Sequence, residues 1–121
     1  MQTEKDFAQK IFTDVREMSK SDLGVTRLGY SEKETQVLRY LEKVALGLGM
    51  NCSYDEAGNL WMTLEGKHPE RPFLMVASHA DSVPEGGNFD GLAGIVSGLC
   101  AAKAIKESGI QLDRNLNVVA F

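Results

Sequence analysis

The sequence has little of what marks a disulfide-stapled, membrane-spanning or nucleic-acid-binding protein. It holds only two cysteines, Cys52 and Cys100, which make neither a disulfide framework nor a CxxC metal pair. No apolar run approaches the ~18–20 residues that span a bilayer, and the charged start MQTEKDFAQK is unlike a signal peptide. The net charge is −4, so the chain has no excess of basic residues to neutralise the phosphates of a nucleic acid. We therefore expect a soluble, cytoplasmic protein with neither membrane nor nucleic acid as partner.

What the sequence does contain is typical of a globular domain. Its 121 residues are 43% hydrophobic and 25% charged, which is enough for one modest core. There is no internal repeat or low-complexity segment. The run 115–121 is apolar and β-prone, with no turn or polar tail after it, which is an unusual end for a domain.

Apolar periodicity predicts the elements. Helical spacing covers roughly 4–20, 32–47 and 91–108, and Ser31-Glu-Lys-Glu34 forms a capping box before the second helix. Apolar residues alternate at 50–54 and 60–64 around the turn-forming 55–59, which predicts a β-hairpin.

The later part of the chain predicts a βαβ unit. The continuous apolar run 73–77 is typical of a strand buried on both faces of a sheet. With the helix 91–108 and the strand 115–121 it would form a right-handed parallel unit. The predicted fold class is therefore α/β, with two helices, a β-hairpin and a βαβ unit in a mixed sheet.

Chemistry-bearing residues gather between the strand 73–77 and the following helix. His79 and Asp81 are two apart and share a side of an extended chain. A metal-binding histidine often donates its second ring N–H to a carboxylate, a role that suits Asp81. Asp90 follows eleven residues after His79 and has two oxygens with which to bridge cations. The pair Gly86-Gly87 would let the loop turn back towards His79.

Simpler interpretations of these residues stay open at this point. A histidine at a strand end is often a hydrogen-bonded surface residue, and an aspartate directly before a helix can be its N-cap. One histidine with carboxylates suits zinc, manganese or cobalt without choosing among them. Arg27 is a candidate for binding a substrate carboxylate, with a salt bridge or a capping role as the alternatives. Glu34 is interpreted as part of a solvated helix face, and His68 as a surface-loop residue.

Two motifs around these residues resemble the metal-binding signature of the M20-type metallohydrolases. They are Ser78-His-Ala-Asp-Ser-Val83 and Gly86-Gly-Asn-Phe-Asp-Gly91. The short gap from His79 to Asp90 resembles the hydantoinase/carbamoylase branch, which includes N-carbamoyl-L-amino acid hydrolases, β-ureidopropionase and allantoate amidohydrolase. Peptidase-like members have a longer insertion there. Two further family-like stretches, 26–31 and 55–60, extend the resemblance over nearly the whole chain.

The resemblance implies a site and a reaction. His79 would bind one metal of a binuclear centre, Asp90 would bridge both metals, and Asp81 would orient His79. The two divalent ions would be zinc or manganese, with cobalt or nickel as alternatives. The implied reaction is metal-dependent hydrolysis of a linear C–N bond in an N-carbamoyl amino acid or related ureido or amide substrate.

The resemblance also implies residues that the chain does not hold. The family carries a Glu-Glu pair, comprising the general base and a metal ligand, after the strand that matches 115–121, and two histidine ligands later. We therefore expect 1–121 to be the N-terminal part of a catalytic domain, inactive alone, whose complete relatives form homodimers through another domain. The alternatives are a non-catalytic truncated remnant or interaction module, and an M20 peptidase or deacylase.

Overall fold

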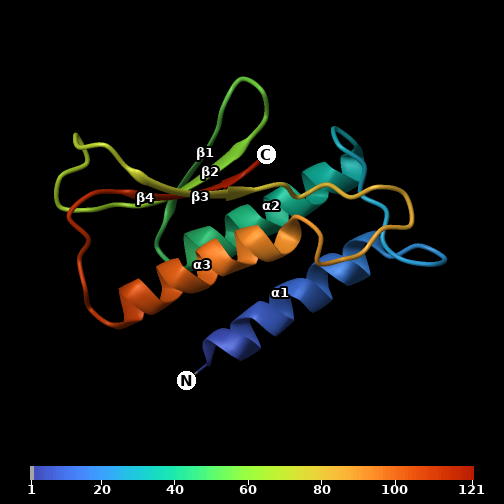
Figure 1. Cartoon of the computed structure of the whole chain (residues 1–121), viewed down its shortest axis with the longest axis horizontal. Helices are drawn as coiled ribbons and strands as arrows, with labels where there is room; N and C mark the ends of the chain where they lie inside the picture. The colour runs from blue at the N-terminus through green and yellow to red at the C-terminus, as the bar shows by residue number, and fades with distance from the viewer. Residues whose placement is uncertain (1) are drawn as a thin grey trace.

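Two amphipathic helices open the chain. The structure, a computed structural model, describes residues 2–121 and places α1 at Glu4–Ser19 and α2 at Glu32–Gly47 (Figure 1). Thr3 Oγ1 accepts a hydrogen bond from the Asp6 N–H, and Ser31 caps α2 in the same way. Both predicted helices are thereby confirmed to within a residue.

The predicted β-hairpin is also confirmed. β1 (Asn51–Tyr54) and β2 (Leu60–Leu64) pair antiparallel, with Tyr54 opposite Leu60. The turn between them is organised by Asp55, whose Oδ1 accepts the N–H groups of Ala57 and Asn59, both at 3.0 Å. These bonds satisfy backbone donors that the turn would otherwise expose.

The second half of the chain forms the predicted βαβ unit. β3 (Leu74–Ser78) leads into α3 (Leu92–Glu107), which returns to β4 (Leu116–Ala120), and β3 and β4 are parallel. β4 also pairs antiparallel with β2, so the four strands make one mixed sheet in the order β1-β2-β4-β3.

All three helices lie on one face of this sheet, and the core fills the space between the layers (Figure 1). The helices and strands each contribute apolar side chains to this core. The fully buried members include Ile11, Val15, Val37, Leu41, Leu60, Met62, Leu92, Ile95, Leu99 and Val118.

The prediction that the run 73–77 is buried on both faces is wrong. β3 is an edge strand, and Phe73, Leu74 and Met75 are 49%, 50% and 45% exposed. The strand that is buried throughout is β4, which pairs with β2 on one side and β3 on the other. A local apolar run predicts a strand, but the order of strands in the sheet decides which one is central.

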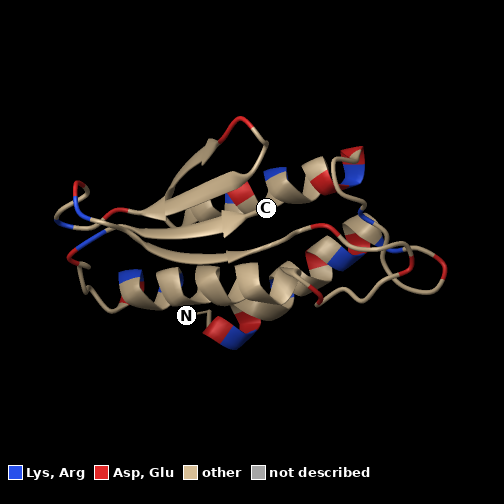
Figure 2. Cartoon of the chain, turned by 45° about the horizontal axis from the view of Figure 1, so that its top comes forward, with Lys and Arg blue, Asp and Glu red and all other residues tan. Residues whose placement is uncertain are grey.

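The sheet face opposite the helices is uncharged and partly open. None of the residues in the four strands is charged, while acidic and basic residues are spread over helices and loops (Figure 2). Trp61 is half-buried there and meets Phe73 edge-on, with ring centroids 6.0 Å apart. The Trp61 Nε1–H donates to Asp55 Oδ2 at 3.0 Å.

No helix formed by residues 2–121 has the length and apolar character to cross a membrane.

Candidate metal centre

The candidate centre lies just past the carboxyl ends of the parallel strands β3 and β4. His79 directly follows β3, and Phe121 directly follows β4. The Phe121 N–H donates to the Ser78 carbonyl at 2.8 Å, so the two strand ends stay together. This edge of an open α/β sheet is where ligands commonly bind. His68, the other histidine, lies in the loop between β2 and β3, where it is half-exposed beside Glu70 and Asp113.

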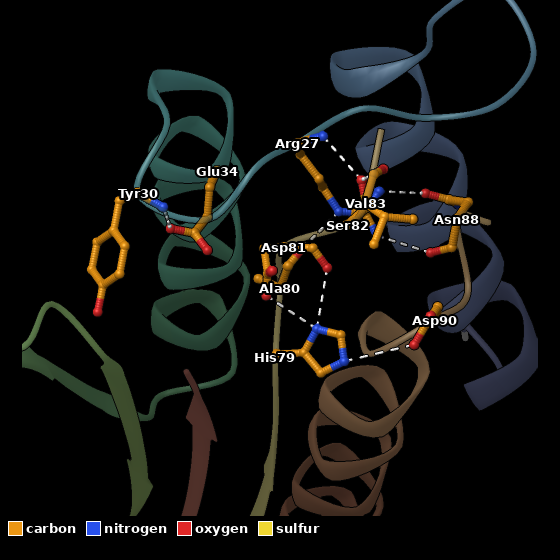
Figure 3. A network of polar contacts seen from close by, with 10 residues as sticks. All are labelled: Arg27, Tyr30, Glu34, His79, Ala80, Asp81, Ser82, Val83, Asn88 and Asp90. Carbon is orange, nitrogen blue, oxygen red and sulfur yellow. Dashed lines mark hydrogen bonds and ion pairs between the residues drawn. The ribbon is translucent and has the colours of Figure 1, made fainter. Parts of the chain in front are cut away.

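One side of the His79 ring is held by Asp81. The Nδ1 atom lies 3.1 Å from Asp81 Oδ1 and 3.1 Å from the Asp81 carbonyl oxygen (Figure 3). Both neighbours are acceptors, so a neutral ring carries its proton on Nδ1 and its lone pair on Nε2. This is the arrangement that an orienting carboxylate requires.

The other side of the ring faces Asp90. His79 Nε2 lies 3.6 Å from Asp90 Oδ1, and both side chains reach solvent, at 47% and 76% exposed (Figure 3). Two ligand atoms bound to one tetrahedral ion at about 2.1 Å each lie about 3.4 Å apart. The separation of Nε2 and Oδ1 therefore fits a shared cation.

The capping alternative for Asp90 is wrong. Gly91 occupies the N-cap position of α3, and that helix start has no side-chain cap. The Asp90 carboxylate is thus not engaged at the helix start, and its backbone carbonyl accepts the Leu92 N–H at 2.8 Å.

Gly91 permits the close approach of α3 to His79. Its φ is 73°, and a Cβ there would lie 2.4 Å from His79 Cε1, closer than any real contact. The pair Gly86-Gly87 does not make the turn as predicted. Glu85, with φ 51°, supplies the other left-handed residue, while Gly86 exchanges backbone hydrogen bonds with Val25 at 2.8 and 2.9 Å.

The structure buries Arg27 instead of presenting it to solvent. Its side chain is fully buried, and its guanidinium donates to Ser19, Ala80 and Asn88. Burial lowers the pKa of this guanidinium, while the charges of Asp81 and Asp90 oppose that effect. The prediction that Arg27 faces a substrate carboxylate therefore has no support in this geometry.

The interpretation of Glu34 as part of a solvated helix face is wrong. It is 9% exposed rather than solvated, and its Oε1 accepts the Tyr30 N–H at 2.8 Å. Burial, with a smaller contribution from Asp81, raises the pKa of its carboxyl group. Its place in the capping box indicated a helix start; nothing local indicated that it faces His79 and Asp81 across a hollow.

That hollow has a volume of about 340 Å³ and opens beside His79 and Asp81, whereas Asp90 does not line it. Its lining includes Tyr30, Glu34, Asn59, His79, Asp81 and Phe121. Within residues 2–121 there is no cluster of three or more histidine, cysteine or acidic side chains that would hold a metal ion by itself. The donor set here is His79 Nε2 with the Asp90 carboxylate, a nitrogen–oxygen pair that zinc and manganese accept.

Comparison with known proteins gives consistent matches over most of the chain. The chain is 32% identical over 119 residues to ureidoglycolate hydrolase of Oryza sativa subsp. japonica, covering 98% of the chain and 25% of that relative. It is 37% identical over 112 residues to an N-carbamoyl-L-amino-acid amidohydrolase of Paenarthrobacter aurescens, covering 90% and 27%.

A solved structure agrees with these relatives. The hydantoinase/carbamoylase family amidase from Burkholderia ambifaria matches 94% of this chain and 29% of its own, with a TM-score of 0.83 and 26% identity. No family model matches. The chain thus spans about a quarter of the length of the relatives it matches.

Proposed function

We propose that this chain, which is homologous to part of the hydantoinase/carbamoylase amidohydrolases, carries part of the metal centre of such an enzyme. The reaction would be cleavage of a linear C–N bond in an N-carbamoyl amino acid or a related ureido acid. The observation that carries the proposal is the His79 ring, held on Nδ1 by Asp81 while its Nε2 faces Asp90 at 3.6 Å.

Each residue has a distinct role in this proposal. His79 would hold one cation through Nε2, Asp90 would share its two oxygens between that cation and a second one, and Asp81 would fix the ring. When bound, two divalent cations, zinc or manganese with cobalt or nickel as alternatives, supply the Lewis acidity that activates water and polarises the scissile carbonyl. The hollow beside His79 would admit a small substrate.

The 121 residues supply only part of what the reaction needs. A catalytic zinc ion normally has three protein ligands, whereas His79 and Asp90 are two. The proton-accepting residue and the other ligands would come from sequence outside residues 1–121. We therefore expect this chain alone to bind metal weakly and to show no turnover. Its assignment as the N-terminal part of a catalytic domain, the homodimer and the cytoplasmic location stay predictions.

A chimera tests the reaction. The matched segment of the Paenarthrobacter aurescens relative is replaced by this chain, and hydrolysis of N-carbamoyl amino acids, N-carbamoyl-β-alanine, allantoate and ureidoglycolate is measured. We expect His79→Ala and Asp90→Asn to lower kcat/KM by about a thousandfold or more, and Asp81→Asn by about 10–100-fold. His68→Ala is the matched control and should leave kcat/KM unchanged. An active chimera that tolerates His79→Ala would disprove the proposal.

Metal binding tests the site without turnover. Zinc is titrated into the chain in competition with a chromophoric chelator, and the same titration is repeated with His79→Ala, Asp90→Asn and His68→Ala. We expect the first two changes to weaken zinc binding by about tenfold or more and the third to have no effect. Equal binding by all four proteins would contradict the assignment of the ligands.

A further inference from the structure

We infer that Arg27 is the positioning residue of the candidate metal centre, because its guanidinium ties together the two ends of the loop that carries His79 and Asp90. The inference rests on the proposed function only in assuming that His79 and Asp90 bind a metal ion. That Arg27 holds the loop is a property of the fold and can be tested without metal.

The contacts of the guanidinium fall at both ends of the loop. Arg27 Nε donates to the Ala80 carbonyl at 2.6 Å, one residue after His79 (Figure 3). Arg27 Nη1 and Nη2 donate to Asn88 Oδ1 and to the Asn88 carbonyl, both at 3.0 Å, two residues before Asp90. One planar group thus bridges the residue after the first candidate ligand and the residue shortly before the second.

The same network anchors the loop to α1. Arg27 Nη1 also donates to Ser19 Oγ at 3.2 Å, and Asn88 Nδ2 donates to the Phe12 carbonyl at 2.9 Å. Both acceptors belong to α1, whose buried face is part of the core. The position of the loop is therefore set by a rigid helix.

The backbone of Arg27 adds a further connection. Its N–H donates to Ser82 Oγ at 3.0 Å, and its carbonyl accepts the Ser82 N–H at 2.9 Å. Side chain and backbone of one residue therefore contact the loop at positions 80, 82 and 88. Among residues 2–121, no other side chain hydrogen-bonds to both ends of the loop.

The geometry requires an arginine. The four bonds diverge from one plane, which suits the fixed fork of a guanidinium and not the single ammonium of lysine. Every acceptor that Arg27 contacts is neutral, and the carboxylates of Asp81 and Asp90 act on it only through space. The buried charge thus holds the loop while leaving the Asp90 carboxylate free to bind a cation.

The functional consequence follows from the tolerance of metal sites. Ligand atoms must be held within about 0.5 Å of their productive positions. The His79 Nε2 to Asp90 Oδ1 separation is 3.6 Å although ten residues lie between the two, and Arg27 limits the movement of both ends of this loop. Loss of this bridge should widen the distribution of separations and weaken metal binding without unfolding the sheet.

The experiment compares Arg27→Lys and Asn88→Ala with Leu41→Ala, a fully buried core position on α2. Native-state amide exchange is followed at Ser82 and Gly86 in the loop and at Val118 in β4. Zinc affinity is measured by chelator competition and expressed per folded molecule.

For Arg27→Lys and Asn88→Ala we expect the Ser82 and Gly86 amides to exchange about tenfold faster or more relative to Val118, and zinc affinity to fall about tenfold. Leu41→Ala should speed up the exchange of slow core amides such as Val118 and leave zinc affinity within twofold. If Arg27→Lys does not fold, Asn88→Ala gives the same comparison. This change keeps Arg27 and its bond to the carbonyl of residue 88, and removes only the hydrogen bonds of the Asn88 side chain to Arg27 and to the Phe12 carbonyl.

The inference is overturned if loop and core amides shift together in both loop variants, or if zinc affinity is unchanged although the loop exchanges faster. Failure of the proposed function looks different: wild-type chain and His79→Ala would then bind zinc equally poorly. In that case the amide exchange, which needs no metal, still decides whether Arg27 holds the loop.

Discussion

Single residues decide how closely the parts of the candidate centre approach each other. Gly91 lies against the His79 ring. Its φ of 73° and the 2.4 Å that would separate a Cβ at this position from His79 Cε1 both exclude other side chains. Gly109 has nearly the same φ, 76°, but a Cβ there would meet nothing within 4 Å. The two glycines therefore separate the conformational requirement from the steric one.

This pair gives a residue-scale prediction. Gly109→Ala should lower the free energy of unfolding by about 1 kcal/mol, from left-handed strain alone. Gly91→Ala should lower it by about 2–4 kcal/mol, because His79 must also move. Urea denaturation measures both. Zinc affinity should fall about tenfold or more in Gly91→Ala and be unchanged in Gly109→Ala; similar values for the two variants would contradict this account of Gly91.

At the scale of elements, the β1–β2 hairpin depends on one carboxylate. Asp55 accepts hydrogen bonds from the backbone of its own turn and from the Trp61 indole N–H on β2. The Trp61 bond, followed by the Asn59 side chain, lowers the pKa of Asp55 from 3.8 to about 2. The turn is thus built to hold a charged aspartate.

The hairpin prediction follows from the sign of that shift. Because the folded pKa lies below the unfolded one, the stabilisation by Asp55 is complete above about pH 4 and is lost as the pH falls through about 2. The fluorescence of Trp61, the single tryptophan, should report this transition. Asp55→Asn should abolish it and lower the urea midpoint at pH 7, whereas Glu56→Gln in the same turn should preserve it. A transition that persists in Asp55→Asn would assign it to another group.

At the scale of the whole molecule, the sheet is covered on one face only. The helices lie on one side of the sheet (Figure 1). Away from them, Trp61 in β2 is partly exposed, and Phe73, just before β3, and Met75, within it, are about half exposed. β3 also leaves one edge without a neighbouring strand within the described chain. Exposed edges and apolar patches of this kind favour association between chains.

The molecular prediction is that the 121-residue chain self-associates through this surface at about 100 μM. Met75→Lys places a charge on the edge strand and should weaken association by about tenfold, or about 1.4 kcal/mol. Gln36→Lys makes the same change on an exposed face of α2 and is the control. Sedimentation velocity measures the association. An equal effect of the two lysines would mean that net charge, rather than this surface, controls it.

The sequence by itself determined the features that depend on neighbours along the chain. The starts of α1 and α2 follow from Thr3 and Ser31, whose side chains bond to backbone three residues later. The hairpin turn follows from Asp55, and the His79–Asp81 contact from two residues in one extended segment. Such short-range interactions are encoded in local spacing, so pattern and propensity suffice to predict them.

Only the tertiary structure decided which groups are buried and which meet. β3 lies at the edge of the sheet because β4, about forty residues later in the sequence, is inserted between β2 and β3. Arg27 is buried against acceptors on Ala80 and Asn88, which lie 53 and 61 residues away in the sequence. Glu34 is buried where the fold places it beside the same hollow as Asp81. The approach of His79 to Asp90 likewise depends on where α3 and α1 hold the loop. Burial and long-range hydrogen bonds arise from the packing of whole elements, which no local pattern specifies.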